Sequence, residues 1–385
     1  MAVVSVTVSP DVLRWARESN GYSVDFVAKK SHIPASTLSK WESDATEMPF
    51  STVEKLAKIL MRPAVALLLE KPPVETPNPP YFRKSEANAE PSSNVLLVIR
   101  RARNLQRMSK ELLENVEEKY EHAFNQELLK ELPEEVATHE RNRLGLTLDE
   151  QRRWISYSGA LKALKKLMEK ENIFVFQMSM PVAEMQGLSL LDKAVPVIVL
   201  NSKDMMQRRI FTMLDEYGHI LLGSPGVCAD IDQPVRNSKN IEIWCNKFAG
   251  SFLVPENELS EFRRTKLYGK ITYKSIAKIA RHFHVSKYMA FIRMKTSDLI
   301  SIEEASDLEK LLKKISKKSK EKTKKSGEQE GGIPDYKKRL AERGPKFIKL
   351  VFENQNKNKI STSEALDYLS IKLGSLEKMK AAVET

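Results

Sequence analysis

One stretch decides how this chain is interpreted: Phe211-Thr212-Met213-Leu214-Asp215-Glu216-Tyr217-Gly218-His219. In an H-E-x-x-H helix, two imidazoles at positions i and i+4 lie on one face and hold zinc. The glutamate beside the first imidazole acts as the general base. Here Glu216 and His219 occupy the expected places, but Asp215 stands at the first ligand position. The stretch therefore predicts a zinc-peptidase helix in which a carboxylate replaces one imidazole.

A downstream segment offers the third ligand. Glu242 lies four residues before Asn246, so the two share one helical face. Carboxylate oxygens are legitimate zinc ligands, and Asp215, His219 and Glu242 form the expected metal set. We expect Asn246 to orient the imidazole of His219 from outside this set. Two anionic ligands should weaken the acidity that zinc confers on water, without abolishing it.

The bare D-E-x-x-H pattern also fits an ordinary amphipathic helix with a single histidine. The flanking residues favour the metal site. Residues 220–222 continue the apolar helix, and residues 244–255 predict a second buried helix that Pro255 ends.

With these motifs the chain resembles the ImmA/IrrE family of metallo-endopeptidases, in the form fused to an N-terminal XRE-type helix-turn-helix. The blocks that carry the resemblance are residues 195–201, 208–222 and 242–255. The resemblance implies a zincin-like domain with Glu216 as base and with His219 and Glu242 as zinc ligands. It also implies a protein substrate, typically a transcriptional repressor. Asp215 departs from the histidine of the family pattern.

The N-terminal region gives the second signal. Apolar spacing and turn residues predict four short helices, at residues 11–18, 24–31, 35–42 and 52–60. A tight turn between the second and third is typical of a repressor-type helix-turn-helix that binds double-stranded DNA. The outward residues of the third helix, which suit phosphate and base-edge contacts, are Ser36, Thr37, Ser39 and Lys40.

A small helical bundle used for protein contacts is the alternative for this region. The third helix carries a single cation, Lys40, so we expect modest affinity of one copy for DNA and binding as a homodimer.

The cysteine content and the hydropathy of the chain indicate the compartment in which the protein is expected. Cys228 and Cys245 show no pairing pattern, which indicates a reducing compartment. Cys245 lies inside the predicted apolar helix and is expected to be packed rather than reactive. The N-terminus lacks a signal peptide and no stretch is long enough to span a membrane. We therefore expect a soluble, cytoplasmic protein with no membrane partner.

The net charge of +12 is concentrated in one segment. Residues 310–325 contain nine lysines against one glutamate, about two-thirds of the excess. Such a run favours a solvated, flexible tether. A sequence-blind contact with phosphates is the alternative.

The expected fold class is α+β, mostly helical. Five segments are expected: a helix-turn-helix domain (1–72), a proline-rich linker (73–95), a peptidase domain with a small sheet (96–300), a lysine-rich linker (301–332) and a C-terminal helical module (333–385). Residues 173–176 and 195–200 predict strands. Pro196 favours an edge position for the second strand, where an extended substrate would add as a further strand.

Three functions stay open at this point. The first is a DNA-bound regulator whose zinc endopeptidase cleaves a partner protein. The second is a catalytically degenerate peptidase fold that binds DNA and a protein or ligand without hydrolysis. The third is a plain repressor whose large domain only dimerises. Retention of Glu216 favours the first, because an inert fold has no chemical reason to keep the base.

Overall fold

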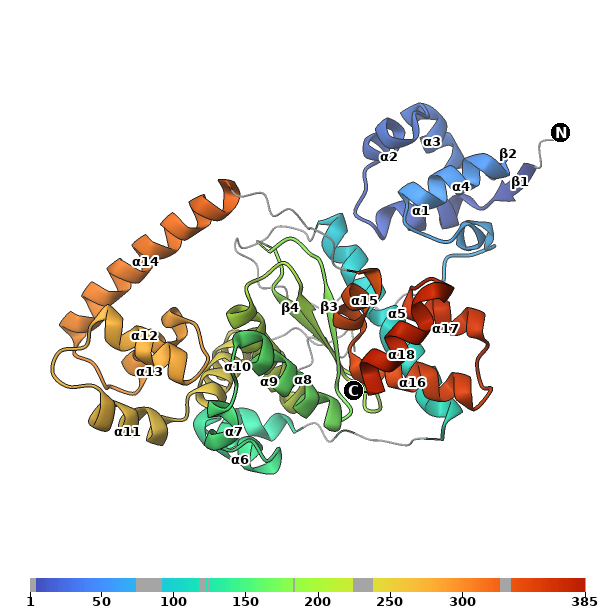
Figure 1. Ribbon diagram of the computed structural model, residues 1–385. Coiled ribbons are helices and arrows are strands. Elements are labelled where there is room, and N and C mark those ends of the chain that lie inside the picture. The colour runs from blue at the N-terminus through green and yellow to red at the C-terminus, as the bar shows by residue number, and fades with distance from the viewer. Residues whose placement is uncertain are drawn as a thin grey trace. The chain divides into compact units, whose positions relative to one another are not determined.

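The chain divides into two compact units. A computed structural model describes residues 5–73, 92–117, 122, 125–182, 184–223, 238–325 and 334–384. The first unit comprises Met1–Arg101 with Ala183–Met185, and the second comprises Ala102–Val182 with Gln186–Thr385 (Figure 1). Cys228 and most of the predicted linker 73–95 lie outside the described residues. The expected fold class, mostly helical α+β, is confirmed.

Short amphipathic helices build the first unit. Its elements are β1 (Ser5–Val8), α1 (Pro10–Glu18), α2 (Val24–Ser31), α3 (Ala35–Trp41), β2 (Thr46–Pro49), α4 (Phe50–Ile59) and a 3-10 helix (Ala64–Leu68). Leu13, Val27, Leu38 and Leu56 meet in its core. The antiparallel pair β1–β2 was not predicted from the sequence.

Local hydrogen bonds and one ion pair set the position of α3. The hydroxyl of Ser23 accepts the backbone N–H of Phe26 and caps α2. His32 ends α2 in the left-handed region, with φ of 53°. Arg17 on α1 donates two bonds of 2.7 Å to the carboxylate of Glu42, directly after α3. This bidentate pair joins α1 to the end of α3.

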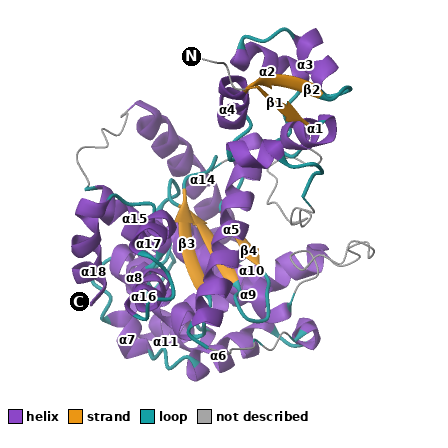
Figure 2. Ribbon diagram, turned by 90° about the vertical axis from the view of Figure 1, so that its right-hand side faces the viewer, coloured by secondary structure: helices purple, strands orange, loops and turns teal. Residues whose placement is uncertain are grey.

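The second unit surrounds a three-stranded sheet with helices (Figure 2). Helix α5 (Ser93–Asn115) begins in the first unit and continues into the second. The other elements are a 3-10 helix (Gln126–Lys130), α6 (Pro133–Arg143), α7 (Leu148–Arg152), α8 (Tyr157–Lys170), β3 (Phe174–Met178), β4 (Gly187–Leu190), β5 (Val197–Asn201), α9 (Met206–Leu222), α10 (Ser238–Leu253), α11 (Glu256–Lys266), α12 (Tyr273–His282), α13 (Lys287–Thr296), α14 (Ile302–Lys325), α15 (Asp335–Arg343), α16 (Pro345–Asn356), α17 (Thr362–Leu369), a 3-10 helix (Leu373–Ser375) and α18 (Leu376–Glu384). No helix among the described residues has the length and apolar character needed to cross a bilayer.

The predicted edge strand is in fact central. The strand order is β3-β5-β4, with β5 parallel to β3 and antiparallel to β4. Pro196 is compatible with this place because it precedes the ladder, and its carbonyl accepts the N–H of Phe174. Among the described strands, β4 is the edge next to α9. The edge assignment of residues 195–200 was therefore wrong.

Buried polar side chains fix the C-terminal end of α10. The carbonyls of residues 252–254 lie where a helix leaves its last acceptors unsatisfied. They accept hydrogen bonds from the buried side chains of Arg141, Gln151 and Arg293, in that order. Burial lowers the pKa of Arg141 to about 10. The side chains thus anchor α10, the helix that carries Glu242, to α6, α7 and α13.

Within the segment expected to be a lysine-rich linker, residues 302–325 form helix α14. Ala305, Leu308 and Leu312 recur at spacings of three and four and are buried in the core of the second unit. The many lysines that follow make this apolar stripe hard to recognise in the sequence. The first half of α14 therefore belongs to the folded unit.

The C-terminal helices are also part of the second unit rather than a separate module. The side-chain amide of Gln177 on β3 donates to the carbonyl of Ala341 on α15. The ring of Phe347 on α16 packs edge-on against Phe176 at 5.6 Å. A strand that is buried on both faces needs cover on each, and α15 and α16 cover one face of β3. The predicted capping box of Ser361 and Glu364 is confirmed at the start of α17.

Gly344 should be essential for this docking. Its φ is +76°, and a Cβ there would lie 2.8 Å from the carbonyl oxygen of Val175 and 2.9 Å from Oε1 of Glu169. Gly344→Ala should therefore lower the free energy of unfolding by about 1–3 kcal/mol. The matched control is Gly374→Ala, where nothing lies within 4 Å of the added Cβ. Urea unfolding midpoints compare the two, and equal midpoints would contradict the docking described here.

Candidate metal centre

Helix α9 places two of the three candidate ligands side by side. Asp215 and His219 are four residues apart, so both lie on the face of α9 that meets α10. Their exposed fractions are 1% and 4%. A carboxylate buried to this degree needs a cation or strong hydrogen bonds to offset its loss of hydration.

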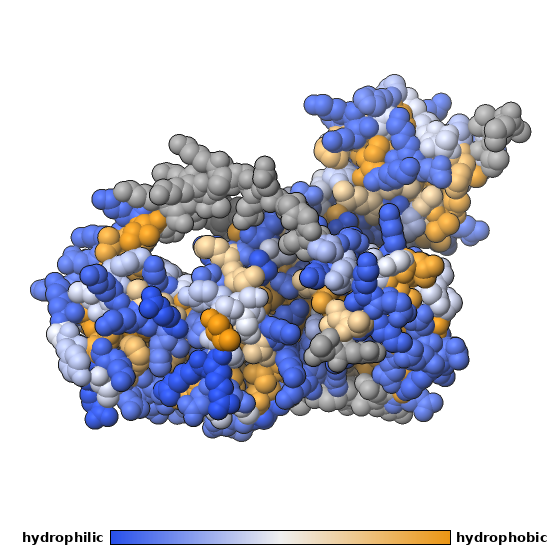
Figure 3. All heavy atoms as spheres, in the orientation of Figure 1, coloured by the Kyte–Doolittle hydropathy of each residue, from blue (hydrophilic) through white to orange (hydrophobic). Residues whose placement is uncertain are grey.

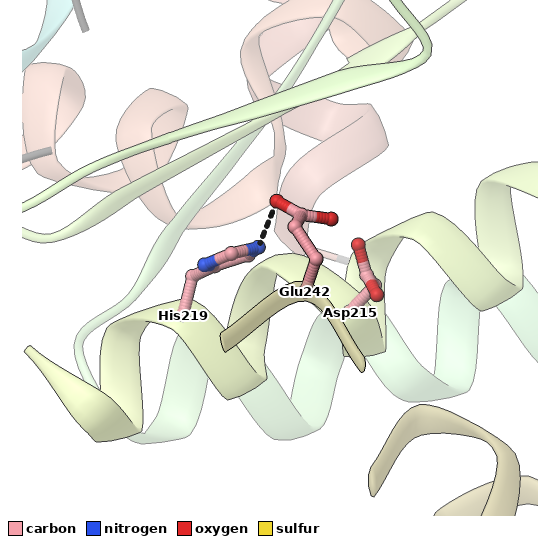
Figure 4. A group of neighbouring side chains, drawn as sticks. All are labelled: Asp215, His219 and Glu242. Carbon is pink, nitrogen blue, oxygen red and sulfur yellow. Dashed lines mark ion pairs between the residues drawn. The ribbon is translucent and has the colours of Figure 1, made fainter. Parts of the chain in front are cut away.

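The third candidate ligand comes from α10. One ligand atom each from Asp215, His219 and Glu242 lies within 4.8 Å of the other two. Nε2 of His219 and Oε1 of Glu242 are 3.3 Å apart (Figure 4). Among the described residues this is the one group of three or more His, Cys, Asp or Glu side chains placed to share an ion.

The three residues fit a divalent metal. Two donors that share one zinc ion through bonds of about 2.1 Å lie at most about 4.2 Å apart. The pair His219–Glu242 is already inside this limit. For the group, whose bound is 4.8 Å, small side-chain movements close the remainder. Imidazole and carboxylate donors suit zinc and also other first-row ions such as manganese and iron.

Hydrogen bonding around His219 outweighs its burial. Burial alone lowers the pKa of this imidazole, but the thiol of Cys245 and the carboxylate of Glu242 raise it well above its usual value. Metal ligation requires the neutral imidazole, so this raised pKa opposes metal binding at low pH. Burial raises the pKa of the Cys245 thiol to about 11, which keeps it protonated and unreactive at neutral pH.

The edge strand β4 holds the candidate base. The hydroxyl of Ser189 donates to Oε2 of Glu216 at 2.7 Å. Two residues earlier on the same strand face, Gly187 leaves room for this side chain. A Cβ at Gly187 would lie 3.2 Å from Oε1 of Glu216 and 2.3 Å from the methyl group of Thr212. Gly187 and Ser189 together form a cradle that orients the carboxylate of Glu216.

Sequence reasoning missed this cradle because it missed β4. The signal was present in Gly187-Leu188-Ser189-Leu190, where small or polar residues alternate with leucines. Alternation of this kind is typical of a strand with two different faces. A segment of four residues is too short to stand out without its partner β5.

Helix α9 is fixed from its other side by Tyr217. The hydroxyl of Tyr217 donates to Glu140 on α6 and accepts a bond from Arg143. Burial, reinforced by the charge of Glu140, raises the pKa of Tyr217 well above its usual value. The tyrosine therefore stays a hydrogen-bond donor throughout the physiological range. Through it α6 and α9 are joined directly behind the candidate ligands.

The remaining predicted site residues lie on the surface. Asn246 is exposed, and its side-chain amide donates to the backbone carbonyl of Glu242 at 2.6 Å. This bond holds the side chain of Asn246 beside the helix turn that carries Glu242. On α3, Ser36, Ser39 and Lys40 are exposed and Thr37 is half-buried.

Measurement of the zinc content of variants should show which residues are ligands. We expect the purified chain to hold about one zinc ion, and His219→Ala to lose it, because two carboxylates alone make a poor zinc site. Asp215→His should tighten binding, since imidazole reaches further than a short carboxylate. The control is His139→Ala on α6, an exposed histidine outside the centre. Elemental analysis after dialysis measures the content, and retention of zinc by His219→Ala would remove that residue from the site.

Comparison with known protein families gives two matches. Residues 13–63 match the helix-turn-helix family model, and residues 168–295 match the model of the IrrE N-terminal-like domain. The second range includes β3, β4, β5, α9 and α10 and therefore the whole candidate centre. No curated protein sequence matches the chain significantly. The resemblance stated from the motifs is confirmed: the chain joins an N-terminal XRE-type helix-turn-helix domain to a peptidase-like domain of the IrrE family.

Proposed function

We propose that this protein is a DNA-binding regulator whose second unit is a zinc-dependent endopeptidase. Its substrate is a partner protein, a transcriptional repressor. The observation that carries the proposal is the meeting of Asp215, His219 and Glu242 beside the cradled carboxylate of Glu216. A fold that had lost its chemistry would have no reason to bury these groups together.

The chain's own residues supply binding and proton transfer. Asp215, His219 and Glu242 would hold the zinc ion, which when bound polarises a carbonyl and makes water more acidic. Ser189 holds Oε2 of Glu216, which leaves Oε1 to accept a proton from the attacking water. The same oxygen then returns that proton to the leaving amine nitrogen.

The edge strand supports a peptide substrate. A strand at the edge of a sheet offers backbone N–H and C=O groups to an added strand. Strand β4 pairs with β5 on one side, and Glu216 lies against β4 itself. An extended segment that added along β4 would bring its backbone to the base. The substrate therefore enters as an unfolded stretch of a protein rather than as a folded surface.

The first unit supplies DNA binding in this proposal. The helix-turn-helix places α3 with Ser36, Ser39 and Lys40 exposed. Hydroxyl groups and a lysine of this kind suit phosphate and base-edge contacts in double-stranded DNA.

Binding without hydrolysis is the second candidate function. The observation that favours it is the direct pairing of Nε2 of His219 with the carboxylate of Glu242 at 3.3 Å. When these two groups pair, one candidate ligand neutralises the other. The side chain of Asp215 is also shorter than the histidine that it replaces and reaches less far toward a metal. Such a protein would regulate by binding DNA and a protein or ligand alone.

Substitution of the base tests the endopeptidase. Glu216→Gln should lower the rate of cleavage of the partner protein by about 10²–10⁴-fold while zinc content stays unchanged, because only proton transfer is removed. Cleavage is followed by gel electrophoresis on the repressor that the protein regulates. Glu261→Gln, at an exposed position on α11, is the control. Unchanged cleavage in Glu216→Gln would leave only the non-catalytic function.

Loss of the hydrogen bond from Ser189 to Glu216 should lower the cleavage rate less than loss of the base itself. Ser189→Ala removes one hydrogen bond to a charged group, so kcat should fall by about tenfold with little change in KM or zinc content. Ser189→Thr keeps the hydroxyl and should recover part of the loss. A fall in zinc content with Ser189→Ala would instead show a structural role for the hydroxyl.

A further inference from the structure

Helices α12 and α13 repeat the arrangement of α2 and α3, the helix-turn-helix of the first unit. Each pair is joined by a short turn with one histidine in the left-handed region, His32 with φ of 53° and His284 with φ of 55°. A buried residue stands five positions before, one position before and six positions after each histidine. These residues are Val27, Ser31 and Leu38 in the first pair and Ile279, Phe283 and Ala290 in the second. The shared spacing gives α12 and α13 the form of a second helix-turn-helix.

The surface that this helix pair presents is basic. Residues 262–297 contain ten Lys and Arg and no Asp or Glu. Arg293 is buried and Arg263 is half-buried, and both donate to backbone carbonyls. The other eight cations are exposed. In Figure 3 hydrophilic residues make up most of the surface over α11, α12 and α13. A surface with so many exposed cations attracts a polyanion.

Three of these cations lie on one face of α12. With about 100° of rotation per residue, Lys274, Lys278 and Arg281 fall within an arc of about 60°. The buried residues of this helix lie on the opposite side and are Ile276, Ile279 and Ala280. None of the three cations forms an ion pair with a residue that the structure describes. Their charges therefore face solvent, where a ligand can reach them.

The start of α13 adds to this surface. Lys287 and Tyr288, the first two residues of α13, are exposed. Nζ of Lys287 donates to the hydroxyl of Tyr273 at 2.7 Å, which holds this charge beside α12. Toward the other end of α13, Lys295 pairs with Glu309 of α14 at 3.7 Å. The part of α13 that can reach a ligand is therefore its N-terminal end.

We propose that α12 and the start of α13 bind double-stranded DNA, mainly through its phosphates. In a helix-turn-helix the first helix crosses the backbone of the duplex, and the N-terminal residues of the second enter the major groove. In this docking Lys274, Lys278 and Arg281 contact phosphates, and Lys287 and Tyr288 reach the groove. Because most contacts are with phosphates, this element has little preference for sequence. The inference goes beyond the proposed function, since it assigns DNA binding also to the unit that holds the candidate metal centre.

The shape of this surface favours DNA over other polyanions. The major groove of a B-form duplex admits an α-helix, whereas that of double-stranded RNA is deep and narrow. An anionic membrane fits less well, because a helix that binds a bilayer inserts its apolar face, and that face of α12 is buried in the core. The same chain also carries the helix-turn-helix of the first unit, and two DNA contacts on one chain raise each other's effective concentration.

The test uses the full chain and a short duplex of random sequence. The α12 variant combines Lys274→Gln, Lys278→Gln and Arg281→Gln. Each lost phosphate contact lowers the slope of log K against log salt concentration by about 0.9, so the slope should be smaller by about 3. Lys278→Gln alone should lower it by about 1. Fluorescence anisotropy titrations at several salt concentrations measure the slope.

The matched control removes three positive charges from one face of α8. Lys162→Gln, Lys166→Gln and Lys170→Gln change exposed residues that recur every four positions in the same unit. This control variant has the same net charge as the α12 variant but should keep the slope of the parent. With a double-stranded RNA of equal length, the parent and the α12 variant should have similar slopes, because α13 cannot enter the narrow groove.

An unchanged DNA slope in the α12 variant would overturn the proposal. An equal fall in the α12 and α8 variants would also overturn it, because that result shows an effect of net charge alone. The third contrary result is a fall of the same size with the RNA duplex, which would show a contact that does not distinguish DNA. None of these measurements involves zinc or cleavage, so this inference can fail while the proposed endopeptidase stands.

Discussion

The burial of a carboxylate beside an imidazole on α9 is the constraint on which the second unit depends. Asp215 and His219 are almost fully removed from water, and such groups are stable only with compensating charge or hydrogen bonds. Much of the surrounding structure places partners for them. Buried side chains anchor the end of α10, which brings Glu242 to His219. Tyr217 joins α9 to α6 directly behind the candidate ligands.

The candidate base, Glu216, is oriented by the sheet rather than by the surrounding helices. Strand β4 lies at the edge, with Gly187 and Ser189 against the carboxylate of Glu216. The same strand presents the backbone groups to which an extended peptide could add. In the proposed function, recognition of substrate and orientation of the base therefore belong to one short element. A change in β4 would affect both at once.

The sequence predicted those features that depend on residues a few positions apart. The i, i+4 spacing of Asp215 and His219 and the position of Glu242 predicted the residues that the fold brings together. The helices of the first unit followed from apolar spacing in the same way. Strand β4 and the central place of β5 could not be read, because strand order depends on pairing between distant residues. The role of the C-terminal helices was missed for a similar reason, since their partner is β3, more than 150 residues earlier.

The positive charge of residues 310–325 indicated the structure of this segment only in combination with the spacing of the apolar residues. A count of lysines in residues 310–325 suggested a tether, whereas Ala305, Leu308 and Leu312 show that helix α14, which contains this segment, packs its first half against the core. Position 215 was difficult for a different reason. Aspartate and histidine can both bind zinc, so the residue type alone does not show whether a metal is held there, and the surrounding side chains are needed.

The most direct test of the central claim is a crystal structure of the zinc-soaked protein with anomalous data on both sides of the zinc absorption edge. The account predicts one anomalous peak within bonding distance of Asp215, His219 and Glu242, with Glu216 next to it but not bonded. Absence of a peak between α9 and α10, or a peak bonded to other side chains while these three remain hydrogen-bonded to protein groups, would contradict it.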